Sequence, residues 1–137
     1  MPQRRFADTF YFLALLSPRD AAHEEAMELS QALPGEIVTT DAVLIELADA
    51  MSSPHDRDIA AATIQNVWDD PVFHVRSIDR ALIGRALALY AARADKDWGL
   101  TDCISFVVMR QEQITDALTA DTHFRQAGFR ILFPQSD

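Results

Sequence analysis

The sequence contains very little cysteine and lysine: Cys103 and Lys96 are the only residues of their types. One cysteine cannot form an internal disulfide, and we therefore expect a protein of a reducing compartment, the cytoplasm. One lysine leaves a single candidate for chemistry that needs an amine nucleophile. With 4 glycines and 6 prolines, the composition is not that of a collagen-like chain or of a turn-rich β-sandwich.

Long hydrophobic runs are also missing. Arg4 and Arg5 precede the apolar stretch 6–16, which superficially resembles a signal peptide. Asp8 interrupts that stretch, no small-residue cleavage site follows, and no segment approaches the roughly 18 apolar residues of a membrane span. We therefore assign the stretch to the fold and expect no membrane partner.

Basic residues are outnumbered by acidic ones: 12 Lys and Arg against 21 Asp and Glu give a formal net charge of −9 at pH 7. This balance argues against broad, nonspecific adhesion to nucleic acid or anionic membranes. The 137 residues, 49% of them hydrophobic, fit one domain over 1–137 that folds without a metal or disulfide staple. A metal ion in this protein would therefore serve chemistry.

Short β-like segments alternate with helical ones along the chain. Strands are predicted at 4–8, 36–40, 73–78, 117–120 and 130–133. Helices are predicted at 9–16, about 20–33, 41–51, 56–68, 79–94, 101–111 and 121–127. Strands separated by helices usually pair in parallel through right-handed crossovers. The sequence therefore predicts an α/β fold, a three-layer α/β/α sandwich with a central, mostly parallel sheet.

Four carboxylates stand out from the acidic surface. Asp8 ends an apolar strand and Asp121 follows another, which places both at the carboxyl edge of the sheet, where open α/β folds bind ligands. Glu46 lies inside the apolar run 42–48, where an unpaired charge is penalised, and Asp102 lies in the first turn of the most apolar helix. If the four converge, their repulsion raises some of their pKa values, and a divalent cation relieves it.

The candidate ligands are all carboxylate oxygens, and the sequence has no Cys and His spacing of the zinc type. The ion that such a site favours is Mg²⁺ or Mn²⁺. Such ions bind phosphate oxygens and activate water, so the expected reaction is phosphodiester hydrolysis. Arginine matches phosphate geometry and could hold flanking phosphates. Two sets of arginines could do so: Arg76, Arg80 and Arg85, or Arg4, Arg5 and Arg130.

The chain resembles the PIN domain family. The likeness is carried in order by Phe6-Ala7-Asp8-Thr9, Glu46 in an apolar helix, Leu100-Thr101-Asp102-Cys103, Leu118 to Phe124, and Gln126 to Phe129. The resemblance implies a Mg²⁺- or Mn²⁺-dependent endoribonuclease acting on RNA, and many bacterial members are the toxins of VapBC-type pairs. An antitoxin protein and a second copy of the chain are the partners that it implies. One departure is Phe10, where many members have a small polar residue.

The resemblance also implies roles for individual residues. The catalytic acids would be Asp8, Glu46, Asp102 and Asp121, of which Asp8, Asp102 and Asp121 would hold the metal. Asp97 would be a possible fifth carboxylate, and Thr9 and Thr101 would be hydroxyl neighbours.

Structural roles compete with these. Asp8, Asp102 and Asp121 could cap helices, and Glu46 could lie on an exposed rim. His123 is interpreted as a surface or packing residue and left out of the site, and Cys103 as a small buried hydrophobe.

Two other functions stay open at this point. A phospho-receiver or phosphatase-like module also places acids at strand ends around Mg²⁺, but it uses a lysine near a late strand end, whereas Lys96 precedes a helix. A noncatalytic α/β module could instead use the acids to hold a structural Mg²⁺ and the apolar N-terminal helix to bind a partner.

Overall fold

The computed structural model describes residues 3–32 and 35–133. The strands are β1 (Arg5–Ala7), β2 (Ile37–Thr40), β3 (Phe73–Arg76), β4 (Asp116–Leu118) and β5 (Arg130–Ile131). The helices are α1 (Thr9–Leu16), α2 (His23–Ala32), α3 (Asp41–Ala50), α4 (Arg57–Asp69), α5 (Arg80–Ala92), α6 (Leu100–Gln111) and α7 (Thr122–Gln126). They follow one another in the predicted order.

Several boundaries differ from the prediction by a few residues, and two of these differences have local causes. The second helix begins at His23, because Asp20 accepts a hydrogen bond from the backbone of Ala22 at 2.9 Å and keeps this segment in turns. Its predicted end, at residues 33–34, lies outside the described residues. Strand β4 ends at Leu118, because the backbone N–H of Thr119 donates to the carbonyl of Ala117 at 3.0 Å in a tight turn.

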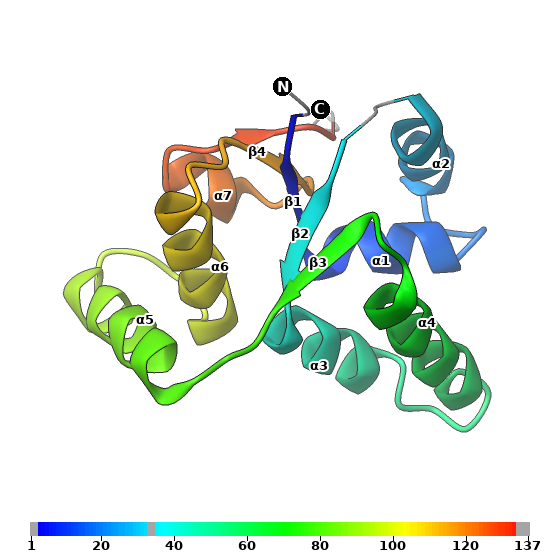
Figure 1. The fold of residues 1–137 in the computed structure, drawn as a ribbon, viewed down its shortest axis with the longest axis horizontal. Coiled ribbons are helices and arrows are strands. Elements are labelled where there is room, and N and C mark those ends of the chain that lie inside the picture. The colour runs from blue at the N-terminus through cyan, green and yellow to red at the C-terminus, as the bar shows by residue number, and fades with distance from the viewer. Residues whose placement is uncertain (1–2, 33–34, 134–137) are drawn as a thin grey trace.

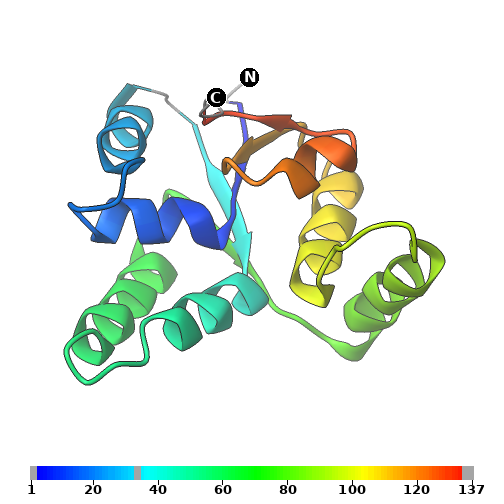
Figure 2. The same cartoon turned by 180° about the vertical axis from the view of Figure 1, so that it is seen from behind.

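The five strands form one parallel sheet in the order β3-β2-β1-β4-β5. Figures 1 and 2 show α1 to α4 on one side of it and α5 to α7 on the other. The predicted three-layer α/β/α class is therefore confirmed. Because the chain leaves β1 toward β2 and later returns to its other side as β4, the strand order reverses at β1. Parallel α/β sheets bind ligands beyond the carboxyl ends of the strands at this position.

An aromatic cluster fixes the helices that flank β1. The ring of Phe106 on α6 lies edge-on to Trp98 and to Phe124 on α7, each with centroids 5.0 Å apart, and Phe124 contacts Phe6 of β1 at 6.3 Å. All four side chains are buried, at 4% exposure or less. The start of α6 and the short helix α7 are thereby held against the strand that ends at Asp8.

No helix within residues 3–32 and 35–133 has both the length and the apolar character that crossing a membrane requires.

Two glycines make a matched test of backbone strain. Gly35 has φ = +124°, and a Cβ there would collide with the backbone carbonyl of Gln3, whereas Gly84 lies exposed within α5 with open space around it. We expect Gly35→Ala to lower the free energy of unfolding by more than about 1–2 kcal/mol and Gly84→Ala to raise it by about 0.5–1 kcal/mol. Urea unfolding of both variants checks this. A neutral Gly35→Ala would contradict the backbone conformation described for residue 35.

Candidate active site

Asp8 lies in the position that precedes α1, directly after β1, yet its side chain makes no capping hydrogen bond to that helix. Its carboxylate is 6% exposed and accepts a hydrogen bond from the hydroxyl of Thr119 at 2.9 Å. The helix-cap alternative for Asp8 is therefore wrong. The side chain is directed instead across the point where the strand order reverses, toward the segment after β4.

Asp121 lies on that segment, just before α7. Its backbone N–H donates to the Thr119 hydroxyl at 3.0 Å, so one buried hydroxyl joins Asp8 to the backbone of Asp121. The Asp121 carboxylate accepts the backbone N–H of His123 at 2.9 Å and thereby caps α7. Capping uses only one of its oxygens, and the side chain stays about one-third exposed. Sequence reasoning did not identify Thr119 as the residue that links the two acids.

Asp102 enters the site from the first turn of α6. Its Oδ2 accepts the backbone N–H of Gly99 at 3.1 Å, which fixes the carboxylate over the helix N-terminus. The same oxygen lies 3.1 Å from Nδ1 of His123. The side chain is 18% exposed, so Asp102 is both held in place and open to solvent.

Burial and mutual repulsion raise the pKa values of two of these acids. The pKa of Asp8 is raised from 3.8 to about 7, first by desolvation and then by the charges of Asp102 and Asp121, against hydrogen bonds that lower it. Desolvation and the charge of Asp121 also raise the pKa of Asp102, while bonds from Gly99 and His123 oppose the shift. The three acids therefore form one electrostatic group at the carboxyl edge of the sheet.

Glu46 contradicts the expectation that it is buried. It lies on an exposed face of α3, next to Ile45, which is itself 55% exposed. The apolar run 42–48 is buried through other positions, so the burial argument for Glu46 was wrong. The side chain nevertheless reaches the site region, because Thr9 donates its hydroxyl to Glu46 Oε1 at 2.6 Å and Thr9 is the chain neighbour of Asp8.

His123 was left out of the predicted site in favour of a surface or packing role, yet the structure places its ring beside two of the acids. Its Nδ1 lies 3.1 Å from Asp102 Oδ2 and 3.5 Å from Asp121 Oδ1. These three residues each offer a ligand atom, and all three atoms lie within 4.8 Å of one another. Sequence reasoning missed His123 because its nearness to Asp102 depends on how α7 packs against α6, 21 residues away along the chain.

Asp97 and Thr101 were the other auxiliary candidates, and Cys103 and Phe10 were assigned no catalytic role. Asp97 is exposed, and Thr101 accepts the hydroxyl of Ser105 through its backbone carbonyl. Cys103 is buried, as expected, and burial raises the pKa of its thiol. Phe10, the departure from the family pattern, packs edge-on against Phe133 at 5.0 Å.

The proposed arginine sets are largely occupied by intramolecular contacts. Glu112 accepts hydrogen bonds from both Arg4 and Arg76 at 2.7 Å. Arg130 makes two bonds to Asp116, at 2.7 and 2.8 Å. These side chains therefore support the fold.

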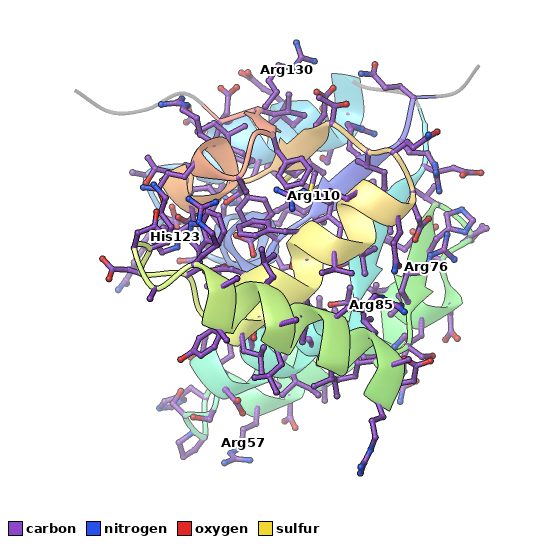
Figure 3. All side chains as sticks on the ribbon, turned by 90° about the vertical axis from the view of Figure 1, so that its left-hand side faces the viewer. Arg57, Arg76, Arg85, Arg110, His123 and Arg130 are labelled. Carbon is purple, nitrogen blue, oxygen red and sulfur yellow. The ribbon has the colours of Figure 1, made fainter. Side chains whose placement is uncertain are left out.

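Two more of the arginines are restricted by burial or pairing. Arg5 is buried at 3% exposure, and Arg85 donates to the Gln111 side-chain oxygen at 2.8 Å when that amide is oriented to accept. Figure 3 shows Arg76 and Arg85 on the flank opposite His123. Arg80 is exposed at the start of α5 and stays a candidate for contact with phosphate.

Comparison with known proteins decides the family. The PIN domain model matches residues 5–130. This chain belongs to the PIN domain family. The match includes β1 to β4 and all seven helices, with Asp8, Glu46, Asp102 and Asp121 inside it. PIN domain nucleases depend on a metal ion, and the cluster of two carboxylates and one imidazole beside Asp8 has the ligand chemistry to hold one.

Individual relatives agree with that assignment. The chain is 29% identical over 132 residues to the 23S rRNA-specific endonuclease VapC20 of Mycobacterium tuberculosis, covering 95% of this chain and 98% of the relative. The crystal structure of that VapC20, a Sarcin-Ricin loop cleaving toxin, superposes with a TM-score of 0.87 at 27% identity, over 94% of this chain and 98% of the other.

More distant structures share the fold. A toxin–antitoxin complex from Klebsiella pneumoniae gives a TM-score of 0.68 at 17% identity, over 97% of this chain and 99% of the other. FitAcB from Neisseria gonorrhoeae gives 0.67 at 17% identity, over 94% and 96%.

The raised pKa of Asp8 makes stability depend on pH in the absence of metal. Between about pH 4 and pH 7 the folded protein keeps a proton that the unfolded chain has lost, so the free energy of unfolding falls as pH rises through this window. Asp8→Asn cannot ionise. We expect this variant to be more stable than the parent by roughly 2–4 kcal/mol at pH 8 and nearly equal to it at pH 4.

Urea unfolding in EDTA at both pH values measures this difference. A gap between Asp8→Asn and the parent that stays the same at pH 4 and pH 8 would contradict the burial of an ionisable Asp8.

Proposed function

We propose that this protein is a metal-dependent endoribonuclease that hydrolyses RNA phosphodiester bonds at the site formed by Asp8, Glu46, Asp102 and Asp121, with Mg²⁺ or Mn²⁺ as its cofactor. The observation that carries the proposal is the meeting of Asp8, Asp102 and Asp121 at the carboxyl edge of the sheet, close enough that the charges of Asp102 and Asp121 raise the pKa of Asp8 and the charge of Asp121 raises that of Asp102. Membership of the PIN domain family supports the same activity.

The proposed roles follow from the surroundings of each acid. Asp102 and Asp121 are partly exposed and hold the ion, while Asp8 lies deeper beside them and adds a third carboxylate. When bound, the ion supplies a Lewis acid for phosphate oxygens and lowers the pKa of water. Glu46 is exposed at the rim and is positioned by Thr9, so it can accept a proton from the attacking water. The products would be a 5′-phosphate and a 3′-hydroxyl.

The relatives suggest the class of RNA and the biological setting. VapC20 is named for cleavage of 23S rRNA at the Sarcin-Ricin loop, and structured ribosomal RNA is therefore the substrate to test first for this chain. We propose that the protein is the toxin of a toxin–antitoxin pair, because the similar VapC20 is a toxin. An antitoxin protein and a second copy of the chain are its proposed partners.

The decisive experiment is RNA cleavage by an Asp102→Asn variant. The amide keeps the size of the carboxylate but removes its charge, so we expect metal-dependent cleavage of ribosomal RNA to fall at least about 100-fold with the fold retained. Asp58→Asn is the matched control, because Asp58 is exposed in the first turn of α4. Cleavage is measured with Mn²⁺, with Mg²⁺ and with EDTA. Undiminished cleavage by Asp102→Asn, or cleavage in EDTA, would refute the proposal.

The contact between Thr9 and Glu46 predicts a second, smaller effect. Thr9→Val removes the donor to Glu46 while keeping the shape of a side chain that is 6% exposed. We expect cleavage to fall roughly tenfold, because a hydrogen bond to a charged group is lost, and Thr9→Ser to retain most of the activity. If the two residues act together, Thr9→Val adds little loss to Glu46→Gln in the double variant. Additive losses would show that Thr9 acts independently of Glu46.

A further inference from the structure

The imidazole of His123 occupies a place suited to a metal ligand. Its Nδ1 lies 3.1 Å from Asp102 Oδ2 and 3.5 Å from Asp121 Oδ1, and the three ligand atoms are within 4.8 Å of one another. In an octahedral site with bonds of about 2.1 Å, adjacent ligand atoms lie about 3.0 Å apart and opposite ones about 4.2 Å. The three atoms already have nearly the spacing that one ion requires.

Local structure keeps the ring in this place. The backbone N–H of His123 donates to Asp121 Oδ1 at 2.9 Å, so His123 and Asp121 are linked at the start of α7. The next residue, Phe124, is fully buried against Phe6 and Phe106 and anchors the helix. The side chain of His123 is nevertheless 29% exposed. Part of the imidazole beside the two acids is therefore open to solvent, from which an ion would enter.

We propose that His123 is a nitrogen ligand of the catalytic ion, through Nδ1, and that it makes the site prefer Mn²⁺ to Mg²⁺. This inference rests on the proposed function, which needs an ion but leaves its identity open. Mg²⁺ prefers oxygen ligands and gives up water reluctantly, whereas imidazole nitrogen binds first-row transition ions. Neutral imidazole with its proton on Nε2 presents the Nδ1 lone pair that this requires.

The other histidines lie elsewhere, which makes a nitrogen signal specific. Nδ1 of His23 is 2.8 Å from the carbonyl of Ala14, and Nε2 of His74 is 3.4 Å from Glu36. His55 is exposed in the turn between α3 and α4. A magnetic coupling between imidazole nitrogen and an ion bound at Asp102 and Asp121 would therefore come from His123.

A purely positioning role is the competing explanation. In that case Nδ1–H donates to Asp102 and only orients the carboxylate. His123→Asn and His123→Ala separate the two roles. The asparagine amide can donate to Asp102 from nearly the same place, but its NH2 group has no lone pair to offer a metal ion, so the variant has no nitrogen ligand at this position. Alanine removes both properties.

The test is Mn²⁺ titration of the full-length protein by electron paramagnetic resonance, with Mg²⁺ as competitor and pulsed measurements to detect ¹⁴N coupling to Mn²⁺. We expect ¹⁴N coupling in the parent and its loss in both variants. Mn²⁺ affinity should fall about 10- to 100-fold in both, while Mg²⁺ affinity changes less than about threefold. Circular dichroism and thermal unfolding without metal check that each variant is folded.

Three outcomes would overturn the inference. The first is bound Mn²⁺ without ¹⁴N coupling in a parent protein that cleaves RNA, and this leaves the proposed function intact. The second is equal weakening of both ions in His123→Ala with full recovery in His123→Asn, which identifies a positioning residue. The third is failure of the parent protein to bind Mn²⁺ or Mg²⁺, which overturns the proposed function as well.

Discussion

The site depends on the cost of burying the Asp8 carboxylate at the carboxyl edge of the sheet. Its pKa of about 7 shows that ionisation there is opposed, mainly by desolvation and further by Asp102 and Asp121. The parallel sheet makes this placement unavoidable, because β1 is central and its carboxyl end is covered by helices on both sides. A proton or a cation can relieve the repulsion. A positive charge is therefore stabilising at the place where the strand order reverses.

The carboxylates at the two ends of the sheet are paired with different basic residues. At the amino end of β4 the buried Asp116 is paired with Arg130, and beyond α6 Glu112 is paired with Arg4 and Arg76. Arginine pairs of this kind lower carboxylate pKa values, as they do for Glu112. At the carboxyl end, Asp102 and Asp121 pair instead with His123. A histidine can lose its charge and offer a lone pair, so this end of the sheet stays able to bind a metal ion.

The sequence predicted what depends on local pattern. The alternation of β-like and helical segments predicted the strands, the helices and the layers. Asp8 and Asp121 each follow a strand, and the carboxyl ends of parallel strands lie at the same edge of the sheet, so both residues could be placed there. It failed where contacts join distant segments. The burial of Glu46 was inferred from the apolar residues around it, but Glu46 lies on the solvent-exposed face of α3. His123 meets Asp102 across 21 residues and Arg4 meets Glu112 across 108, and periodicity carries no record of such pairs.

The local charge balance explains how a protein of net charge −9 can act on a polyanion. A divalent cation would offset the negative charge of Asp102 and Asp121, and burial opposes the ionisation of Asp8 as long as no ion is bound. Glu46 is exposed at the rim, where solvent screens its charge. RNA would approach a centre whose negative charge the ion has largely offset. The acidic surface elsewhere disfavours nonspecific contacts, so binding would depend on the fit of the RNA to this one edge of the sheet.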